Sequence, residues 1–237
     1  MGRRVLALIR HGEYAQPAGV PSAHLPYGLT ARGAVQARDA AATVLEFARQ
    51  SELTLDPVID CSRLRRAWET ANLMARALTE TDGRCFECRE FEALAERSVG
   101  AMANLSVEVI EAILRDDPRC SLPPPGWKRN AEYRLPFQGC ESLAQAGERV
   151  AQHLRRCAAG LLPGGAAGLL KLVVGHGGAF RHAARELGVL SADQVASLSM
   201  GYGAPVYLEV KRPEAEQDRF VHIAGHWTQR QLSAAID

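Results

Sequence analysis

The chain has 237 residues, of which 47% are hydrophobic and 23% are charged, as in globular proteins that bury a sizeable core. Its 28 basic and 27 acidic residues leave a net charge of +1, without the basic excess that nucleic-acid binding requires. No apolar run approaches the roughly 20 residues of a membrane span, so we expect a cytoplasmic protein with no nucleic-acid and no membrane partner.

Apolar runs of strand length alternate with amphipathic stretches of helical length. In chain order we expect a strand at 5–9, a helix at 30–50, a strand at 57–61, a helix at 65–78, a strand at 85–90, a helix after Ser142, a turn at 162–168, a strand at 169–174, a helix at 179–187 and strands at 205–211 and 219–223. Thr30 is a predicted N-cap, and Ser142-x-x-Gln145 is a capping-box signature. The alternation predicts an α/β fold, a three-layer α/β/α sandwich with a mainly parallel central sheet.

One segment interrupts this alternation. Residues 116–139 hold five of the twelve prolines, together with Trp127, Tyr133 and Phe137. A long irregular stretch in a compact domain is usually functional or disordered, although its aromatic residues can also simply pack the loop. We expect one domain over residues 1–237, with an irregular insertion or lid at about 97–140 that passes over the active site.

The six cysteines are scattered through the chain, which suits reduced thiols better than a disulfide framework. Cys85 and Cys88 form an isolated C-x-x-C, without the second pair or the spaced histidines of a zinc site. Their neighbours Phe86 and Phe91 indicate a strand rather than the helix start of a thioredoxin-like site. We therefore predict structural roles for these cysteines.

Two histidines directly follow predicted buried strands. Arg10-His11-Gly12 follows the first strand, and His176-Gly177-Gly178 follows the strand at 169–174. In open α/β sheets, ligands bind beyond the carboxyl ends of the strands, and the amides that open a helix can bind an anion. The glycine after each histidine lets the backbone approach a ligand closely. The sequence therefore predicts that both histidines lie at one ligand site.

A third segment, 62–71, also follows a strand and opens a helix. It contains Arg63, Arg65 and Arg66, and guanidinium groups form the bidentate, charge-assisted contacts that phosphoryl groups require. Together with the two histidines, this segment predicts a phosphate-binding site.

Six motifs resemble, in order, those of the histidine phosphatase superfamily, which includes the cofactor-dependent phosphoglycerate mutases. They are Arg10-His11-Gly12-Glu13, Leu29-Thr30-x-x-Gly33-x-x-Gln36-Ala37, Ser62-x-Leu64-x-Arg66-Ala67-x-x-Thr70-Ala71, Leu94-x-Glu96-Arg97-x-x-Gly100, Gly139-x-Glu141-Ser142 and Val174-Gly175-His176-Gly177-Gly178. The resemblance runs through most of the chain and implies a phosphoglycerate mutase-like fold. It singles out Arg66, and leaves Arg63 and Arg65 as solvated helix residues.

The resemblance implies five catalytic residues. His11 attacks phosphorus in line and becomes a phosphohistidine, which requires an unprotonated ring nitrogen. Arg10, Arg66 and His176 hold the phosphoryl oxygens and stabilise the charge of the transition state. Glu96 donates a proton to the leaving alkoxide and then takes one from the hydrolytic water. No metal and no other cofactor is expected, because the cationic side chains already stabilise this charge.

The expected partner is a small phosphorylated substrate, although a phosphoprotein also fits; the oligomeric state is not predicted. Expected substrate contacts come from Gly12, Tyr14, Arg97 and Gly177. The charges of Arg97, Lys128 and Arg129 suit a substrate with a second anionic group. His24 is a further candidate for the pocket wall, whereas the histidines at 153, 182, 222 and 226 are expected to be structural.

Several departures from the mutases bear on the reaction. In the mutases the first motif runs on to a Trp-Asn pair whose Asn contacts the phosphate, where this chain has Gln16-Pro17. Asn104 stands where the mutases have a second glycine, and Lys128-Arg129 follows a proline run instead of preceding one. These differences favour a phosphatase. Mutase-type phosphoryl transfer remains the first alternative, because Glu96-Arg97-x-x-Gly100 is closer to the mutases, and a catalytically inactive module that binds phospho-ligands is the second.

Overall fold

The fold is built on a mixed sheet ordered β4-β3-β5-β1-β7-β8, with β2 paired to β5. Its strands are β1 (Arg4–Arg10), β2 (Leu53–Leu55), β3 (Val58–Ser62), β4 (Glu87–Phe91), β5 (Gly168–Gly175), β7 (Pro205–Lys211) and β8 (Arg219–Gly225). The pairings among β1 to β5 are parallel, whereas β7 pairs antiparallel with both β1 and β8. The prediction of a mainly parallel sheet is therefore confirmed.

This computed structural model describes residues 2–21, 23–161, 168–211 and 218–230. The predicted glycine-rich turn at 162–168 lies outside the described residues except for Gly168, which begins β5. Among the described residues, no helix combines the length and the apolar character needed to cross a membrane.

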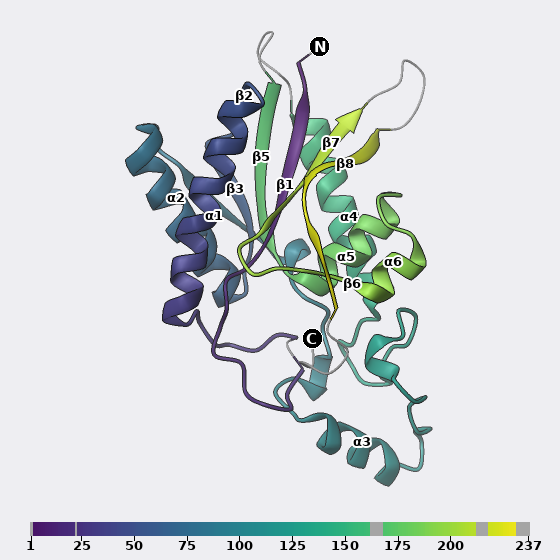
Figure 1. The fold of residues 1–237 in the computed structure, drawn as a ribbon. Helices are drawn as coiled ribbons and strands as arrows, with labels where there is room; N and C mark the ends of the chain where they lie inside the picture. Colours follow the sequence, from purple (N-terminus) through teal and green to yellow (C-terminus); the bar gives the residue numbers. More distant parts are fainter. Residues whose placement is uncertain (1, 22, 162–167, 212–217, 231–237) are drawn as a thin grey trace.

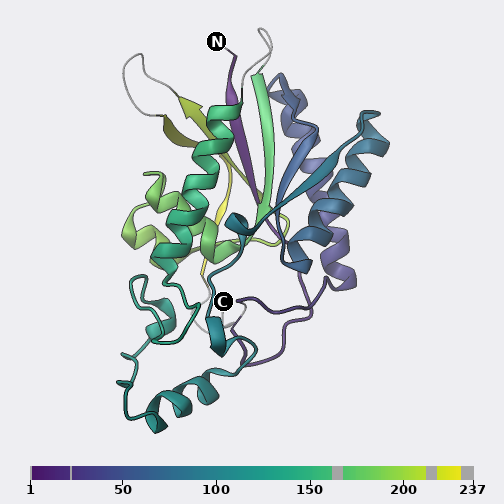
Figure 2. The same ribbon diagram turned by 180° about the vertical axis from the view of Figure 1, so that it is seen from behind.

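Helices cover both faces of the sheet (Figures 1 and 2). The helices α1 (Ala31–Gln50) and α2 (Arg65–Asp82) pack on one face, and α4 (Leu143–Gly160) and α5 (Gly177–Glu186) pack on the other. Consecutive side chains of a strand point to opposite faces. The buried run in β1 therefore supplies both cores: Ile9 lies in the cluster under α1 and α2, and Leu8 in the cluster under α4 and α5. The predicted three-layer architecture is confirmed.

The predicted helix starts have the expected capping interactions. Thr30 Oγ1 accepts a hydrogen bond of 3.0 Å from the Gly33 amide at the start of α1. Ser142 and Gln145 form both bonds of the predicted capping box at the start of α4. The helix α5 begins at Gly177, two residues before the predicted start, so that His176 is its N-cap residue.

The insertion contains more regular structure than its sequence indicates. The helix α3 (Val107–Asp116) lies beyond the carboxyl ends of β1 and β5, at the bottom of Figure 1. Between 117 and 139 the one helical segment is a 3-10 turn at Trp127–Arg129, so this stretch is irregular as expected. Trp127 is buried, and its indole Nε1 donates to Glu111 Oε1 on α3 at 3.0 Å. A hydrophobic cluster within the insertion, which includes Ile110 and Leu135, also takes in Ala23 from the loop after β1.

Besides α3, the short strand β2 was not predicted, nor were the helix α6 (Ala192–Ser197) and the strands β6 (Leu198–Met200) and β9 (Trp227–Gln229). The strands β6 and β9 form a separate antiparallel ribbon in which Met200 pairs with Trp227. The ribbon brings the chain after Met200 next to the carboxyl end of β1, where the Arg10 guanidinium donates to the Met200 carbonyl at 2.9 Å.

Candidate active site

Three of the predicted catalytic residues meet at the carboxyl ends of β1 and β5. Arg10 is the last residue of β1 and pairs in register with Gly175, the last residue of β5. The His11 amide donates to the Gly175 carbonyl at 3.0 Å, which extends this pairing by one step. His176 follows Gly175 directly, and the ring centroids of His11 and His176 are 5.1 Å apart. The parallel register of the two strands therefore brings together histidines that lie far apart in the sequence.

Arg66 reaches the same point from the first turn of α2 and is fully buried. Its Nε donates to His11 Nε2 at 3.2 Å, and its two terminal nitrogens donate to the carbonyls of Ala23 and Leu25 at 2.8 and 3.1 Å. Arg63 and Arg65 are exposed, so they do not share this position. The structure therefore places Arg66, as the motif indicates, between the nucleophile candidate and the loop after β1.

The hydrogen bonds of His11 define its tautomer. His11 Nδ1 lies 2.7 Å from the Gly12 carbonyl oxygen, which can only accept, so Nδ1 carries the proton. Nε2 accepts from Arg66 and is therefore unprotonated. Burial, followed by the positive charges of Arg66 and Arg10, holds the pKa of His11 well below its ordinary value of 6.5. The ring is neutral, with an Nε2 lone pair.

His176 has a buried polar atom that a ligand could satisfy. Its Nε2 lies 2.9 Å from Ser62 Oγ, and Ser62 Oγ in turn accepts from the Leu64 amide at 3.2 Å. A hydroxyl that donates to Nε2 leaves the proton of the ring on Nδ1. Within the described part of the chain, this Nδ1 has no hydrogen-bond partner. Burial, then the charge of Arg66, lowers the pKa of His176 well below 6.5, so this imidazole is also neutral.

Two tyrosine rings enclose His11 and the arginines. The Tyr14 ring meets His11 edge-on at 5.3 Å and lies 4.6 Å from the Arg66 guanidinium carbon. The Tyr202 ring lies 5.7 Å from His11 and 4.0 Å from the Arg10 guanidinium carbon. Tyr14 was predicted, whereas Tyr202 was missed because no motif surrounds it.

Gly12 allows close packing beside the histidine. Its amide donates to Thr70 Oγ1 at 3.0 Å, and a Cβ on Gly12 would collide with the Gly33 carbonyl oxygen. A Cβ on Gly33 would in turn collide with the Glu13 carbonyl oxygen. The two glycines therefore let the turn after β1 lie directly against the start of α1.

Glu96 lies next to His176, at the N-terminal end of α5. Its Oε1 accepts from the amides of Arg97 and Ala179 at 2.9 and 3.0 Å, and its Oε2 accepts from the Gly178 amide at 3.2 Å. His24 Nε2 lies 3.0 Å from the Glu96 carbonyl oxygen, so the predicted wall residue His24 contacts the backbone of this glutamate. The amides of Gly178 and Ala179 belong to the first turn of α5 and have no partner inside the helix, so the Glu96 side chain supplies one.

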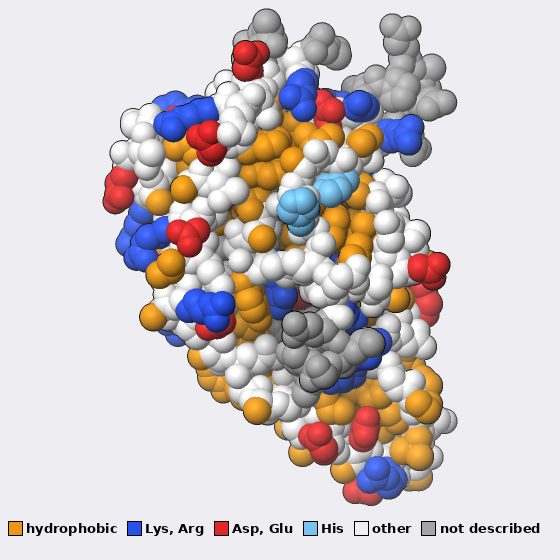
Figure 3. Space-filling model, viewed as in Figure 1, with side chains coloured by type: hydrophobic (Ala, Val, Ile, Leu, Met, Phe, Trp, Pro, Cys, Tyr) orange, Lys and Arg blue, Asp and Glu red, His pale blue; other side chains and the backbone are white. Residues whose placement is uncertain are grey.

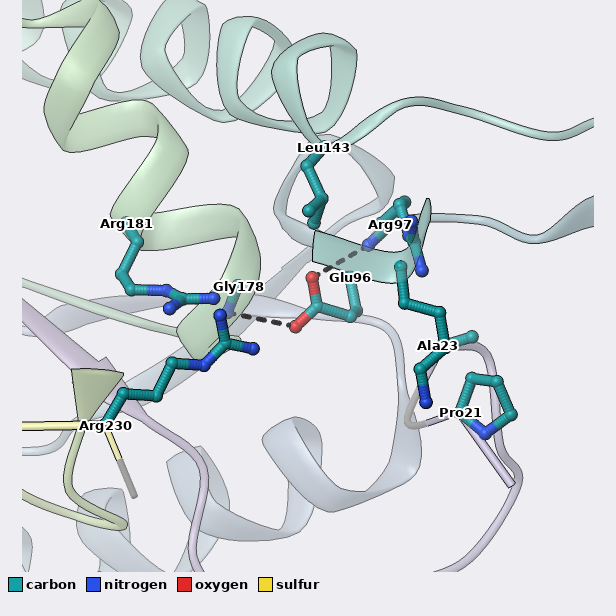
Figure 4. Close-up of a pocket in the computed structure, with 9 residues that line it drawn as sticks. Pro21, Ala23, Glu96, Arg97, Leu143, Gly178, Arg181 and Arg230 are labelled. Atoms are coloured by element: carbon teal, nitrogen blue, oxygen red, sulfur yellow. Dashed lines mark hydrogen bonds between the residues drawn. The ribbon is translucent and has the colours of Figure 1, made fainter. Parts of the chain in front are cut away.

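The Glu96 carboxylate also lines a pocket surrounded by basic side chains, which are Arg97, Lys128, Arg181 and Arg230. Arg181 and Arg230 lie on one side of Glu96, and Pro21 and Ala23 lie on the other (Figure 4). Basic side chains are also visible on the surface near the carboxyl end of the sheet (Figure 3). Arg181 and Arg230 were missed, because a single arginine carries no sequence signal. The exposed Arg129 is not among the residues that line this pocket.

The sheet, the R-H-G turn and the second arginine motif define the class of this protein, and the comparison with known families agrees. The chain belongs to the histidine phosphatase superfamily (branch 1), whose family model matches residues 6–222. Members of this superfamily are phosphohydrolases or mutases. The family and the fold predicted from the motifs are confirmed.

The relatives include both kinds of enzyme. The chain is 30% identical over 210 residues to a 2,3-bisphosphoglycerate-dependent phosphoglycerate mutase of Parvibaculum lavamentivorans, which covers 87% of this chain and 90% of the relative. The fold of this chain is similar to that of the mycobacterial glucosyl-3-phosphoglycerate phosphatase, with a TM-score of 0.67 and 23% identity. The match covers 94% of this chain and 97% of the phosphatase chain. This chain is also similar to the structure named mycobacterial hydrolase 2, with a TM-score of 0.71, 23% identity and coverage of 98% and 94%.

The neutral state of His11 can be measured by NMR. In the folded protein at pH 6, long-range ¹H–¹⁵N spectra should show a neutral His11 ring protonated at Nδ1, because burial and two arginines lower its pKa. In the urea-unfolded chain the same ring should titrate at about 6.5. As the pH falls, the unfolded chain binds this proton at a higher pH than the folded protein does. The free energy of unfolding therefore keeps the full contribution of neutral His11 above about pH 6.5 and decreases as the pH falls below that value. The His11 ring signal is identified by its absence in His11→Asn. A charged His11 ring in the folded protein at pH 6 would contradict the neutral state assigned to it.

Proposed function

We propose that the protein is a phosphatase that hydrolyses a phosphomonoester through a phosphohistidine on His11. One observation carries this proposal: the Nε2 lone pair of a buried, neutral His11 faces the Arg66 guanidinium, while the ring proton is held on Nδ1 by the Gly12 carbonyl. A nucleophilic histidine needs this tautomer and a cationic environment for the phosphoryl group.

In the first step, His11 Nε2 attacks phosphorus and the bond from phosphorus to the substrate oxygen breaks. Arg10, Arg66 and the Nδ1–H of His176 hold the three non-bridging oxygens in this proposal. Arg66 Nε already donates to His11 Nε2, so it meets a phosphoryl oxygen as soon as Nε2 takes up the phosphorus. The leaving alkoxide receives a proton from Glu96. Charge-assisted hydrogen bonds of this kind stabilise the spread-out charge of the transition state.

In the second step, water attacks the phosphohistidine, the P–N bond breaks, and the electron pair returns to His11 Nε2. Glu96 takes the proton of the attacking water. Its two oxygens differ in this respect: Oε1 accepts two amide hydrogen bonds, whereas Oε2 accepts one longer bond of 3.2 Å from Gly178. We therefore assign the proton transfers to Oε2.

The loop after β1 supports hydrolysis over mutase-type transfer. Pro17, which has no side-chain hydrogen-bond donor, stands where the mutases have the Asn that contacts the phosphate, and the side-chain amide of the neighbouring Gln16 donates to the Val20 carbonyl at 3.0 Å, inside its own loop. Asn104 does not separate the two reactions, because its φ of 65° is the left-handed conformation that a glycine would also adopt. Mutase-type transfer remains the second candidate, because the sequence relatives at 30% and 27% identity are phosphoglycerate mutases.

The phosphoenzyme is the direct test. Incubation with radiolabelled phosphomonoesters should give an acid-labile, alkali-stable phosphoprotein that is absent in His11→Asn, and turnover should fall by about 10⁴-fold or more. The matched control is His222→Asn, because His222 is an exposed histidine on β8. Release of phosphate without isomerisation supports the phosphatase. Transfer between the hydroxyls of phosphoglycerate would show a mutase, and binding without either reaction would show an inactive phospho-ligand module.

The role of Glu96 can be isolated with substrates of different leaving groups. Glu96→Gln should slow the hydrolysis of alkyl phosphates by about 10²- to 10⁴-fold, the usual contribution of general acid catalysis. It should slow aryl phosphates with acidic phenols much less, because their leaving groups need no proton. The control is Glu92→Gln, since Glu92 is an exposed carboxylate four positions earlier. The comparison uses kcat/KM, which reports the step that releases the alcohol and not the later attack of water on the phosphohistidine; an equal loss of kcat/KM for both kinds of substrate would show that Glu96 does not protonate the leaving group.

We also propose that the substrate carries a second anionic group, held by Arg97 and Lys128. Both side chains line the pocket that contains Glu96, and Arg97 is buried. Burial lowers the pKa of both groups, and the charge of Arg97 lowers that of Lys128 further, so an anion between them would relieve unfavourable charge. The backbone amide of Arg97, which donates to Glu96, is unaffected by changes to its side chain.

Arg97→Gln should therefore raise the KM of phosphorylated carboxylic acids by about 10- to 150-fold, as expected for a lost hydrogen bond to a charged group. It should leave the kcat and KM of phenyl phosphate nearly unchanged. Arg115→Gln, on the exposed face of α3, is the control. A similar loss with both substrates would mean that Arg97 supports the catalytic residues rather than a second anionic group.

A further inference from the structure

A second cluster of reactive side chains lies on the sheet face under α4. Asp60 projects from β3, His153 and Cys157 from α4, and Lys171 from β5. Asp60 Oδ2 lies 2.9 Å from His153 Nε2 and 3.3 Å from Cys157 Sγ, and its other oxygen lies 2.8 Å from Lys171 Nζ. Asp60 lies two residues before Ser62, the residue that contacts His176. Two residues of a strand span roughly 7 Å, so the cluster lies about that far along β3 from the proposed phosphoryl site. The proposed hydrolysis uses none of these groups.

The connectivity of the cluster argues against a catalytic cysteine. In a Cys–His catalytic pair the imidazole receives the proton of the thiol. Here the Cys157 thiol donates to Asp60 instead, and burial together with the Asp60 charge raises its pKa to about 12. The thiol, the imidazole and one carboxylate oxygen instead form a group of three possible metal ligands, with their ligand atoms all within 4.8 Å of one another.

We propose that Asp60, His153 and Cys157 bind a Zn²⁺ ion, with water as the fourth ligand. One carboxylate oxygen, one imidazole nitrogen and one thiolate are donors that zinc takes in four-coordinate sites. His153 and Cys157 are four residues apart on α4, so both side chains project from the same face of the helix. Lys171 Nζ donates to the Val58 carbonyl at 2.7 Å and to Asp60 Oδ1. This contact leaves the second carboxylate oxygen of Asp60, Oδ2, next to His153 and Cys157.

The distances from Asp60 to the other two proposed ligands are slightly shorter than those around a zinc ion. Around a tetrahedral zinc ion, an oxygen and a nitrogen ligand are separated by about 3.3 Å, and an oxygen and a sulfur ligand by about 3.6 Å. The corresponding distances here are 2.9 Å for Asp60 to His153 and 3.3 Å for Asp60 to Cys157. For these two pairs, zinc binding requires each distance to lengthen by a few tenths of an ångström, and the ligand atoms of His153 and Cys157 also lie within 4.8 Å of each other.

The charge of the cluster also suits a dication. Without the ion, the carboxylates of Asp56 and Asp60 outnumber the one ammonium of Lys171, which lies 3.4 Å from Asp56. Binding of Zn²⁺ with loss of the Cys157 proton changes this net charge from −1 to zero. Arg89 and Arg156 at the rim are exposed, so solvent screens their charges. A pocket of about 390 Å³ borders the cluster and gives the ion and its water a route of entry.

Cobalt substitution provides the first test. Metal-free, reduced protein should bind one equivalent of Co²⁺, with a sulfur-to-cobalt charge-transfer band and the strong visible bands of tetrahedral cobalt, and Zn²⁺ should bleach both. Cys157→Ser should abolish the charge-transfer band, and His153→Gln should weaken binding by at least about 100-fold, since loss of even an outer partner costs 10- to 100-fold. Cys85→Ser, at an exposed cysteine, is the matched control.

A second measurement needs no variant of the cluster. Because the pKa of Cys157 is raised, its alkylation in the metal-free protein is slow and is followed over long incubations by mass spectrometry; Zn²⁺ should slow it further without changing the alkylation of Cys85. The His11→Asn protein should show the same protection, so failure of the proposed hydrolysis would not affect this result. Absence of the cobalt bands in the unmodified protein, their persistence in Cys157→Ser, or unprotected alkylation of Cys157 would each overturn the zinc site.

Discussion

The hydrogen bond from Arg66 to His11 is the interaction on which the site depends. It joins the first turn of α2 to the end of β1, and the same guanidinium holds the carbonyls of Ala23 and Leu25 in the loop after β1. A buried arginine is costly unless every donor is satisfied, and a broken buried network leaves an uncompensated charge. Arg66 therefore has two effects: its donated hydrogen bond keeps Nε2 of His11 unprotonated, and its guanidinium joins the start of α2, the end of β1 and the loop after β1.

The parallel sheet makes this arrangement possible. The registered ends of β1 and β5 put Arg10 beside Gly175, which brings His11 and His176 within ring contact. Burial in this position is the first cause of the low pKa of both rings. The same packing that completes the core beneath the sheet thus produces the neutral imidazoles that nucleophilic chemistry needs.

The parts that could be predicted from the sequence are those whose signal is local or belongs to a family motif. Strand runs, the Thr30 cap and the Ser142 capping box gave the sheet and helices, and the ordered motifs gave Arg66 rather than its neighbours Arg63 and Arg65. The helix α3 was missed although its local signal is present: Ser106 caps it, its buried residues Ile110 and Leu114 are four apart, and Pro118 stands just beyond its end. Tyr202, Arg181 and Arg230 reach the site only through tertiary packing, which no local pattern encodes. No metal was expected from the sequence, because the four-residue spacing of His153 and Cys157 indicates the proposed zinc site only when β3 brings Asp60 beside the two residues.

The start of α5 links the proposed chemical roles. His176 is its N-cap residue, and the next amides, those of Gly178 and Ala179, hold the Glu96 carboxylate. One helix end therefore positions both a phosphoryl ligand and the acid, so their separation is set by a rigid element rather than by a flexible loop. A rigid spacing matters because general acid catalysis is effective only when the proton lies within hydrogen-bond reach of the leaving oxygen. In the proposed mechanism, the basic side chains around Glu96 select the phosphomonoester whose leaving oxygen reaches this carboxyl group. The proposal therefore assigns phosphoryl transfer to residues at the strand and helix ends and assigns substrate selection mainly to the insertion, through Arg97 and Lys128.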